Sequence, residues 1–354
     1  QVAPSGRSHP RSERDHRKQF LVAPQLQSMR DRNDPRTHGR LPPETALSLL
    51  SNEVRAAVLW QLSEARGGDG PPPVLSFSEL RSRAAPDVDS SRFNYHLKEV
   101  VGTYVERVDP DGDREDASRP VPQMAGEREA GYQLTPEGTT LIRTIRAWST
   151  ENDIDREFAL DQSCYYCGTG LTARYENAIL AVECPACAYL YDYNLTPPGV
   201  FYAPGIEEAD DGTVLERAAE YNRHIRLGFA RGICPYCGNT VDAEFQDPAD
   251  TGYPRADRRK ALLRRGCAHC GNKDNITVGE FLLQDTRLIS FCQRHGLDVT
   301  EPPIWAMEFA ATDRQTKIQS LDPWEVAVRL EMGGDRITFS VDESLRIHVV
   351  AEEN

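Results

Sequence analysis

The sequence predicts an α+β protein with a helical N-terminal module, two small cysteine-pinned modules and a C-terminal antiparallel β meander. Three observations support this fold class. Between residues 41 and 150, helical and strand patterns follow the order helix, helix, helix, strand, strand, helix. Eight of the nine cysteines form four Cys-x-x-Cys pairs between residues 164 and 270. Segments that alternate apolar and polar residues recur over about the last fifty residues, which is typical of strands.

Residues 1–40 are predicted to be a disordered basic tail, because they are rich in Arg, Ser, Pro and Gln and contain almost no apolar cluster. They hold nine basic and four acidic residues, so the rest of the chain is more acidic than the total charge of −14 indicates. An acidic body with few lysines suits a protein that stays soluble in high salt. The tail is either a solvated segment or a basic arm on a DNA backbone, and Met29 is a candidate start of the chain.

Residues 41–150 are predicted to form a winged helix-turn-helix. Apolar residues recur every three or four positions in the helical segments, and capping residues mark where several helices begin. In order, the elements are helices before Ser51, over 52–66, from the Ser76–Glu79 capping box and from Asp89, strands over 104–108 and 131–134, and a helix that Thr135 opens. We expect that last helix to continue to about Phe158.

The helix that begins near Asp89 is the predicted recognition helix, because the corresponding helix of a winged helix-turn-helix lies in the DNA major groove. Its polar face offers side chains that bind phosphates or base edges. His96 is expected to pack within the helical module instead. The same element order also occurs in winged helices that bind proteins, so both kinds of partner stay open on this pattern. The candidate DNA-binding residues are Ser90, Ser91, Arg92, Asn94, Tyr95 and Lys98.

Four motifs in this region resemble the ArsR-type winged helix-turn-helix transcriptional regulators: LSNEVRAAVL (50–59), SFSEL (76–80), FNYHL (93–97) and YQLTPEG (132–138). More narrowly, the chain resembles haloarchaeal regulators that join this module to a cysteine-knuckle, zinc-ribbon-like C-terminal domain of uncharacterised function. The resemblance implies sequence-specific binding of double-stranded DNA as a homodimer, with residues 90–101 as the recognition helix. Arsenic sensing does not transfer, because this module contains no cysteine. The acidic stretch between Asp109 and Ala130 predicts no wing contact with phosphates.

The cysteine pairs predict two closed metal sites. Two such knuckles complete a tetrahedral four-thiolate site, which structural zinc prefers and which leaves no position open for water or substrate. Disulfides need an oxidising compartment, and redox dithiols usually occur singly. Iron in a rubredoxin-like site uses the same ligands and stays open. We therefore expect zinc in a folding role. Paired in order, the ligands are Cys164, Cys167, Cys184 and Cys187 at one site and Cys234, Cys237, Cys267 and Cys270 at the other.

Residues 151–354 are predicted to form one C-terminal domain: zinc ribbon 1 (161–195), a helical connector (196–231), zinc ribbon 2 (232–276) and a helix followed by the β meander (277–354). Cys292 is expected to be buried in that helix and His269 to be exposed. The basic segment 254–265 is either a second nucleic-acid contact or a solvated loop. The meander, with expected strands at 305–309, 324–332, 336–341 and 345–350, suits an effector pocket or a dimer surface.

Two functions from different classes fit these features. The leading one is a sequence-specific DNA-binding transcriptional regulator, and the alternative is an adaptor of the transcription machinery, similar to archaeal initiation factors that pair a winged helix with zinc ribbons. An enzyme is not expected, because we find no Ser/His/Asp set, Gly-rich phosphate loop, His-x-x-x-His or paired carboxylates in an apolar context. Without a secretory signal or a long apolar run, we expect a cytoplasmic protein with no membrane partner.

Overall fold

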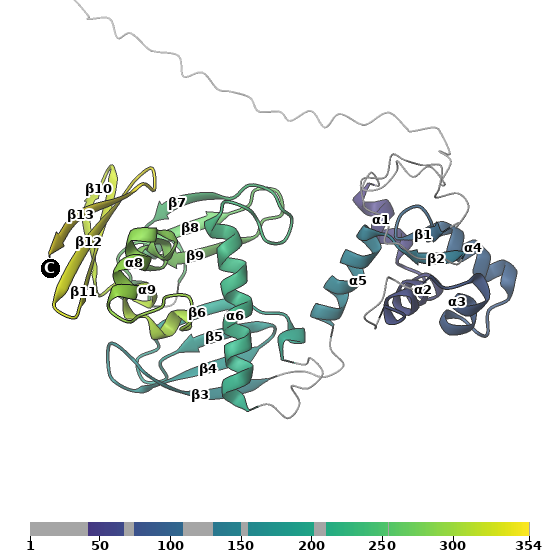
Figure 1. The fold of residues 1–354 in the computed structure, drawn as a ribbon, viewed down its shortest axis with the longest axis horizontal. Helices are drawn as coiled ribbons and strands as arrows, with labels where there is room; N and C mark the ends of the chain where they lie inside the picture. The colour runs from purple at the N-terminus through teal and green to yellow at the C-terminus, as the bar shows by residue number, and fades with distance from the viewer. Residues whose placement is uncertain are drawn as a thin grey trace, which may run out of the picture. The chain divides into compact units, whose positions relative to one another are not determined.

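A computed structural model describes residues 42–66, 74–108, 130–149, 155–201, 210–253 and 255–353 (Figure 1). The predicted tail (1–40) and all but the end of the acidic stretch 109–130 lie outside the described residues. The chain divides into two compact units, Gln1–Ile142 and Arg143–Asn354. The predicted α+β class is confirmed, since helices and antiparallel sheets occur together and the helices of the N-terminal part precede two four-cysteine groups.

The first unit has the predicted order of helices and strands. Asn52, Ser76 and Asp89 each accept backbone N–H groups at the start of a helix, and Ser76 and Glu79 form the predicted capping box. The two strands pair antiparallel. The elements are α1 (Pro43–Leu49), α2 (Glu53–Glu64), α3 (Phe77–Ala84), α4 (Ser90–Val100), β1 (Val105–Val108), β2 (Gly131–Leu134) and α5 (Pro136–Trp148), of which α5 runs across the boundary between the units.

Helix α4 is held by one apolar face. Phe93, Leu97 and Val100 are fully buried at helical spacing and pack in the same hydrophobic cluster as Val58 and Leu80 of the helices before them. The buried stripe fixes the rotation of α4 about its own axis. The opposite, polar face is therefore turned to solvent.

The second unit begins with the sheet of ribbon 1. Its strands are β3 (Arg156–Ser163), β4 (Gly170–Glu176), β5 (Ile179–Glu183) and β6 (Leu190–Leu195), in the order β3-β4-β5-β6. The expectation that α5 continues to Phe158 is wrong. Phe158 lies in β3 opposite Ala173 and is buried in the core. This segment forms a strand because it pairs with β4, a contact that a local sequence pattern does not reveal.

Ribbon 2 follows the 20-residue helix α6 (Asp211–Ala230) and contains β7 (Asp242–Gln246), β8 (Leu262–Gly266) and β9 (Lys273–Thr277). The basic segment 254–265 is not one solvated loop, because β8 begins inside it and Arg259 and Arg265 are buried. Arg255, Arg258 and Arg264 are half-buried and Lys260 is exposed, so a nucleic-acid contact there stays a prediction. Arg259 donates to the carbonyls of Leu190 and Ala311, 2.7 and 3.1 Å away. The buried arginines thus tie parts of the core together.

The last part of the unit is helical and then forms the meander, in the strand order β10-β11-β12-β13. Segment 305–309 is not the expected strand: Trp305 and Phe309 lie in short helical turns, and both are buried. Their spacing of four residues suits a helix as well as a strand, and β10 takes the place expected for this segment. The elements are α7 (Val278–Phe281), α8 (Thr286–Arg294), α9 (Glu308–Ala311), β10 (Thr316–Leu321), β11 (Trp324–Met332), β12 (Asp335–Asp342) and β13 (Ile347–Glu353).

One hydrophobic cluster connects all parts of the second unit. It includes residues of ribbon 1, α6, ribbon 2, α8 and the meander, and α6 runs past both ribbon sheets (Figure 1). Cys292 is fully buried in it, as expected, and burial raises the pKa of its thiol to about 11. Among the described residues, no helix has both the length and the apolar character that crossing a membrane requires.

Candidate metal centres

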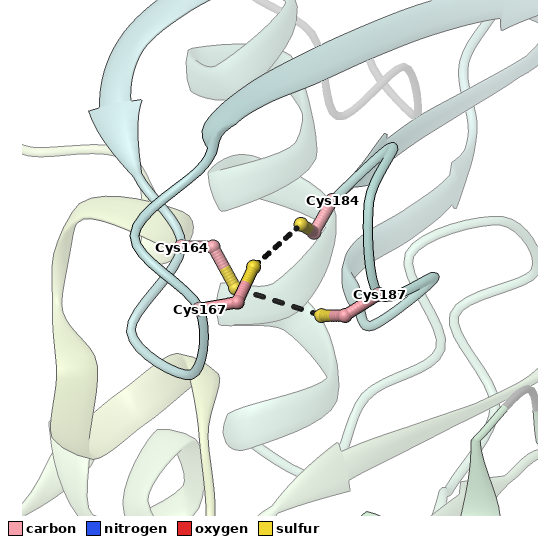
Figure 2. Close-up of side chains that lie close together, drawn as sticks. All are labelled: Cys164, Cys167, Cys184 and Cys187. Carbon is pink, nitrogen blue, oxygen red and sulfur yellow. Dashed lines mark hydrogen bonds between the residues drawn. The ribbon is translucent and has the colours of Figure 1, made fainter.

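The four cysteines of ribbon 1 converge from two loops. The Sγ atoms of Cys164 and Cys187 lie 3.7 Å apart, and those of Cys167 and Cys184 lie 3.4 Å apart (Figure 2). All four sulfurs lie within 4.8 Å of one another. A tetrahedron of thiolates about 2.3 Å from a zinc ion has S–S edges of about 3.8 Å. The observed spacing fits a four-coordinate metal ion.

Ribbon 2 repeats this geometry. The Sγ atoms of Cys234 and Cys270, and those of Cys237 and Cys267, lie 3.6 Å apart in each pair. The four again lie within 4.8 Å of one another, and exposed His269 is not among them. Both groups therefore pair the knuckles in sequence order, and each is a set of four soft donors that can hold a metal ion.

The backbone folds each knuckle in the same way. The N–H of Cys164 donates to the carbonyl of Thr169 at 2.8 Å, and the N–H of Gly168 donates back to the Cys164 carbonyl at 2.9 Å. The other three knuckles repeat both bonds, at 2.8 to 3.0 Å. The residue after the second cysteine is left-handed in every case: Gly168 (φ 78°), Gly238 (φ 71°), Gly271 (φ 76°) and Ala188 (φ 54°).

A family whose description is a domain of unknown function, DUF7351, matches residues 161–347, more than half of the chain. The chain belongs to the DUF7351 family. A second domain of unknown function, DUF7347, matches residues 43–145. No curated protein and no solved structure matches the chain. Both four-cysteine groups lie inside the DUF7351 match, and α1 to α4 lie inside the DUF7347 match.

Ala188 marks the one knuckle of the DUF7351 domain without glycine at the left-handed position. We expect Ala188→Gly to raise the free energy of unfolding by about 1 kcal/mol. A left-handed conformation costs an L-residue roughly 1–2 kcal/mol, and glycine avoids this cost. The greater conformational entropy of glycine in the unfolded chain offsets part of the gain. The reverse change, Gly238→Ala, is expected to lower it by a similar amount. A Cβ at Gly238 meets no atom within 4 Å, so this variant isolates backbone strain. Denaturant titration of the metal-loaded protein measures the change in unfolding free energy of both variants. Changes of the same sign in the two variants would contradict an effect of backbone strain.

The sulfurs of ribbon 1 have polar neighbours. The Tyr191 hydroxyl donates to Cys164 Sγ at 3.2 Å, and the backbone N–H of Tyr166 donates to the same sulfur at 3.4 Å. The Arg258 guanidinium bonds Cys187, which raises the pKa of Arg258. These donors offset part of the negative charge that four thiolates place around one cation.

In the absence of a cation, the thiols of ribbon 1 differ in pKa. Hydrogen bonds with Thr169 lower the pKa of Cys167 to about 6, whereas burial raises the pKa of Cys184 to about 12. Four thiolates this close repel one another, so all four ionise together only when a cation compensates them. Metal binding to the DUF7351 domain is therefore expected to release protons and to weaken as the pH falls.

Ribbon 2 is less protected. Cys237 and Cys270 are both exposed, whereas in ribbon 1 Cys167 is the exposed ligand. The side-chain N–H donor beside the buried sulfur of Cys234, Asn272 Nδ2, lies 3.9 Å away, farther than the Tyr191 hydroxyl lies from Cys164. Exposed thiolates are more open to chelators and oxidants.

We therefore expect ribbon 2 of the DUF7351 domain to lose its metal first. A colorimetric chelator should release metal in two phases, the faster removed by Cys237→Ser. Tyr191→Phe should accelerate only the slower phase, because it removes the hydroxyl donor to Cys164. Tyr175→Phe is the matched control, since the hydroxyl of Tyr175 is also buried but donates to the carbonyl of Thr196. Release of the metal in a single phase from the wild-type protein would contradict a difference in protection between the two ribbons.

The predicted DNA-contacting residues all lie outside the buried stripe of α4. Ser90, Ser91, Arg92, Tyr95 and Lys98 are exposed on α4 and Asn94 is half-buried. Tyr95 keeps 62% of its surface in contact with solvent, a high value for an aromatic side chain. His96 is half-buried, its ring edge-on to that of Tyr95. Sequence reasoning missed Tyr191 and Arg258 as partners of the thiolates, although a tyrosine run beside Cys184-x-x-Cys187 was visible.

Proposed function

We propose that this member of the DUF7351 family is a sequence-specific DNA-binding transcriptional regulator of the ArsR-like winged-helix type. The observation that carries the proposal is the exposed polar face of α4. Its opposite face is buried in the module core, so the side chains that bind phosphates and base edges are presented on a rigid helix. The order of elements around α4 is that of a winged helix-turn-helix.

The chemistry of α4 suits double-stranded DNA. Arg92 offers a planar pair of donors for a guanine edge, Asn94 can pair with adenine, and Lys98 can neutralise a phosphate. Ser90 and Ser91 lie in the first turn of the helix, where their hydroxyls can donate to a phosphate. We propose that two copies bind a two-fold symmetric operator as a homodimer in the cytoplasm.

The metal groups support a structural role for the second unit. All eight ligands are thiolates, so each site is closed and activates no water, and we propose zinc as the metal in both. The spacing of the sulfurs accommodates iron as well as zinc, and an element-specific assay separates them. We expect two zinc ions per chain.

Binding to promoter DNA tests the regulator. We expect Arg92→Ala and Asn94→Ala each to weaken binding to a selected operator by roughly tenfold to a hundredfold, since a good bidentate pair discriminates bases by about 1–3 kcal/mol. Lys98→Ala should weaken binding to all DNA sequences by a similar factor and reduce the dependence of the affinity on salt concentration. Arg143→Ala, an exposed arginine on α5, is the control. Unchanged operator affinity in both Arg92→Ala and Asn94→Ala, with folding intact, would contradict this recognition helix.

An adaptor of the transcription machinery is the second candidate. It is favoured by exposed apolar side chains at the end of α6 and beside the ribbon 2 knuckle, namely Leu227, Ile233 and Tyr236. Such side chains are typical of protein contacts. This candidate predicts co-purification with RNA polymerase and no sequence preference on DNA, whereas the regulator predicts a preferred operator.

A further inference from the structure

A cavity of 490 Å³ lies in the second unit, where α6, ribbon 2, the α7–α8 segment and the turn before β13 meet. No part of the proposed DNA-binding or metal-binding function uses it. Its volume is in the range of sites that hold small organic ligands. It is lined by residues of all four parts: Phe229, Ala230 and Gly232, then Val241, Ala243 and Arg265, then Phe281, Gln284, Asp285 and Arg287, and finally Leu345 and Ile347.

Two arginines line this cavity and use the same edge of the guanidinium on an aspartate. Arg265 donates from Nε and Nη2 to Asp274 at 3.0 and 2.5 Å. Arg287 donates from Nε and Nη2 to Asp285 at 2.9 and 2.5 Å, and from Nη2 to the carbonyl of Ile347. In both arginines, Nη1 has no hydrogen-bond partner among the described residues. Each guanidinium is thus fixed by its aspartate and keeps an Nη1 group that can donate to a ligand.

Arg265 is the stronger indication of the two. It is only 4% exposed, and its guanidinium also lies 5.2 Å from the centre of the Phe229 ring. The Nη1 atom of Arg265 is not among the fully buried polar atoms that lack a partner, so it reaches the open volume of the cavity. A ligand carboxylate in the cavity can accept a charge-assisted hydrogen bond from it.

The charge and the walls of the cavity narrow the class of ligand. Of the residues that line it, Arg265 and Arg287 are cationic and Asp285 is acidic, and Asp274 pairs with Arg265 from outside the lining. An anionic group is therefore attracted by the free edges of the two guanidiniums and not by a net charge. Most of the other lining residues are apolar, with aromatic rings at Phe229 and Phe281. This combination suits an anionic group on an apolar body and is poor for a bare inorganic anion, which has no surface to bury.

We propose that this cavity binds a small carboxylic acid with an aromatic or branched aliphatic body, and that Nη1 of Arg265 and Nη1 of Arg287 donate to its carboxylate. The apolar body packs against Phe229, Phe281 and Ile347. Because the ligand joins α6, ribbon 2 and the turn before β13, its binding stabilises the second unit. The proposal does not depend on DNA binding.

Calorimetric titration of the metal-loaded full-length protein without DNA tests this site. The probes are phenylacetate and 3-methylbutanoate, with phenylacetamide, 3-methylbutanamide and inorganic phosphate as comparisons. We expect at least one carboxylate to bind and to raise the melting temperature, and the amides and phosphate to bind at least about tenfold more weakly, as loss of charge-assisted hydrogen bonds or of apolar burial requires.

Three variants separate this site from unspecific binding. Arg287→Ala should weaken carboxylate binding at least about tenfold, and Ala243→Trp should abolish it by filling the cavity from an exposed lining position. Arg294→Ala should leave it unchanged, because Arg294 lies on the same helix but pairs with Glu352. The proposal is overturned if neither carboxylate binds, if the amides or phosphate bind equally well, or if folded Arg287→Ala and Ala243→Trp bind like the wild type.

Discussion

Chelation of the bound metal is expected to unfold the second unit and to leave the first unit folded. Each metal ion adds to the hydrophobic core that the ribbons share with the rest of the second unit. In small modules, structural zinc contributes on the order of 10 kcal/mol to folding. A whole domain is stable by only about 5–15 kcal/mol. One sulfur in each knuckle is buried in the second unit, at Cys164, Cys184, Cys234 and Cys267. Loss of the ions therefore leaves repelling or protonated thiols inside the core.

The measurement is thermal unfolding followed by circular dichroism before and after EDTA. The helical signal of α1 to α4 should keep its own transition, because the core of the first unit contains no cysteine. The β signal of the second unit should be lost, and should return when zinc is added back.

Cys184→Ser and Cys292→Ser are a matched pair for this prediction. Both cysteines are 0% exposed, but only Cys184 belongs to a four-sulfur group. We expect Cys184→Ser to lose one metal ion per chain and to unfold the second unit at moderate temperature. Cys292→Ser should keep both ions and cost about 1–3 kcal/mol, the penalty for a buried hydroxyl. Equal losses of stability in the two variants, with metal content unchanged, would contradict a structural role of the metal.

The parts of this fold that sequence reasoning predicted are those that local chemistry decides. A Cys-x-x-Cys turn closes through its own backbone, so the sequential pairing of the knuckles follows from spacing alone. The caps at Asn52, Ser76 and Asp89 are likewise contacts within four residues. The polar face of α4 follows from the apolar stripe opposite to it.

The parts that it missed depend on contacts between distant residues. Phe158 is in a strand because β4 lies beside it, and Arg265 is buried because Asp274 faces it across β8 and β9. A run of arginines indicates an exposed basic loop only when each charge remains in water. The buried partners that reverse this expectation are up to 69 positions away in the sequence, as for Arg259 and the carbonyl of Leu190.

Replacement of Arg226 is expected to cause the largest loss of stability of any single charged residue that we consider. Its guanidinium bonds Asp192, 3% exposed, and its Nε lies 2.9 Å from Glu280 Oε1. The network joins β6, α6 and α7. Arg226→Met keeps the apolar stem but leaves the carboxylates of buried Asp192 and half-buried Glu280 without their closest cation. Breaking a buried pair in this way costs about 3–5 kcal/mol. Denaturant titration of the metal-loaded protein measures the loss.

Arg174→Met is the matched control, because Arg174 pairs with Glu183 at 3.3 Å on the surface and is half exposed. We expect a cost below about 1 kcal/mol there, as for other exposed pairs. A loss in Arg226→Met no larger than in Arg174→Met would show that the network does not stabilise the unit. Adding Glu280→Gln to Arg226→Met should recover part of the loss, since it removes one uncompensated charge.

The pH dependence distinguishes lost charge pairing from lost packing. Burial raises the pKa of Glu280 above its ordinary value, even though Arg226 opposes the shift. A raised carboxyl pKa favours folding most at low pH, where the group is protonated, and this contribution is lost as the pH rises through the raised value. Without Arg226 the pKa of Glu280 rises further, so the deficit of Arg226→Met should be smaller near about pH 5 than near about pH 8. A deficit that is constant over this range would indicate that the arginine acts through the packing of its stem, because packing does not titrate.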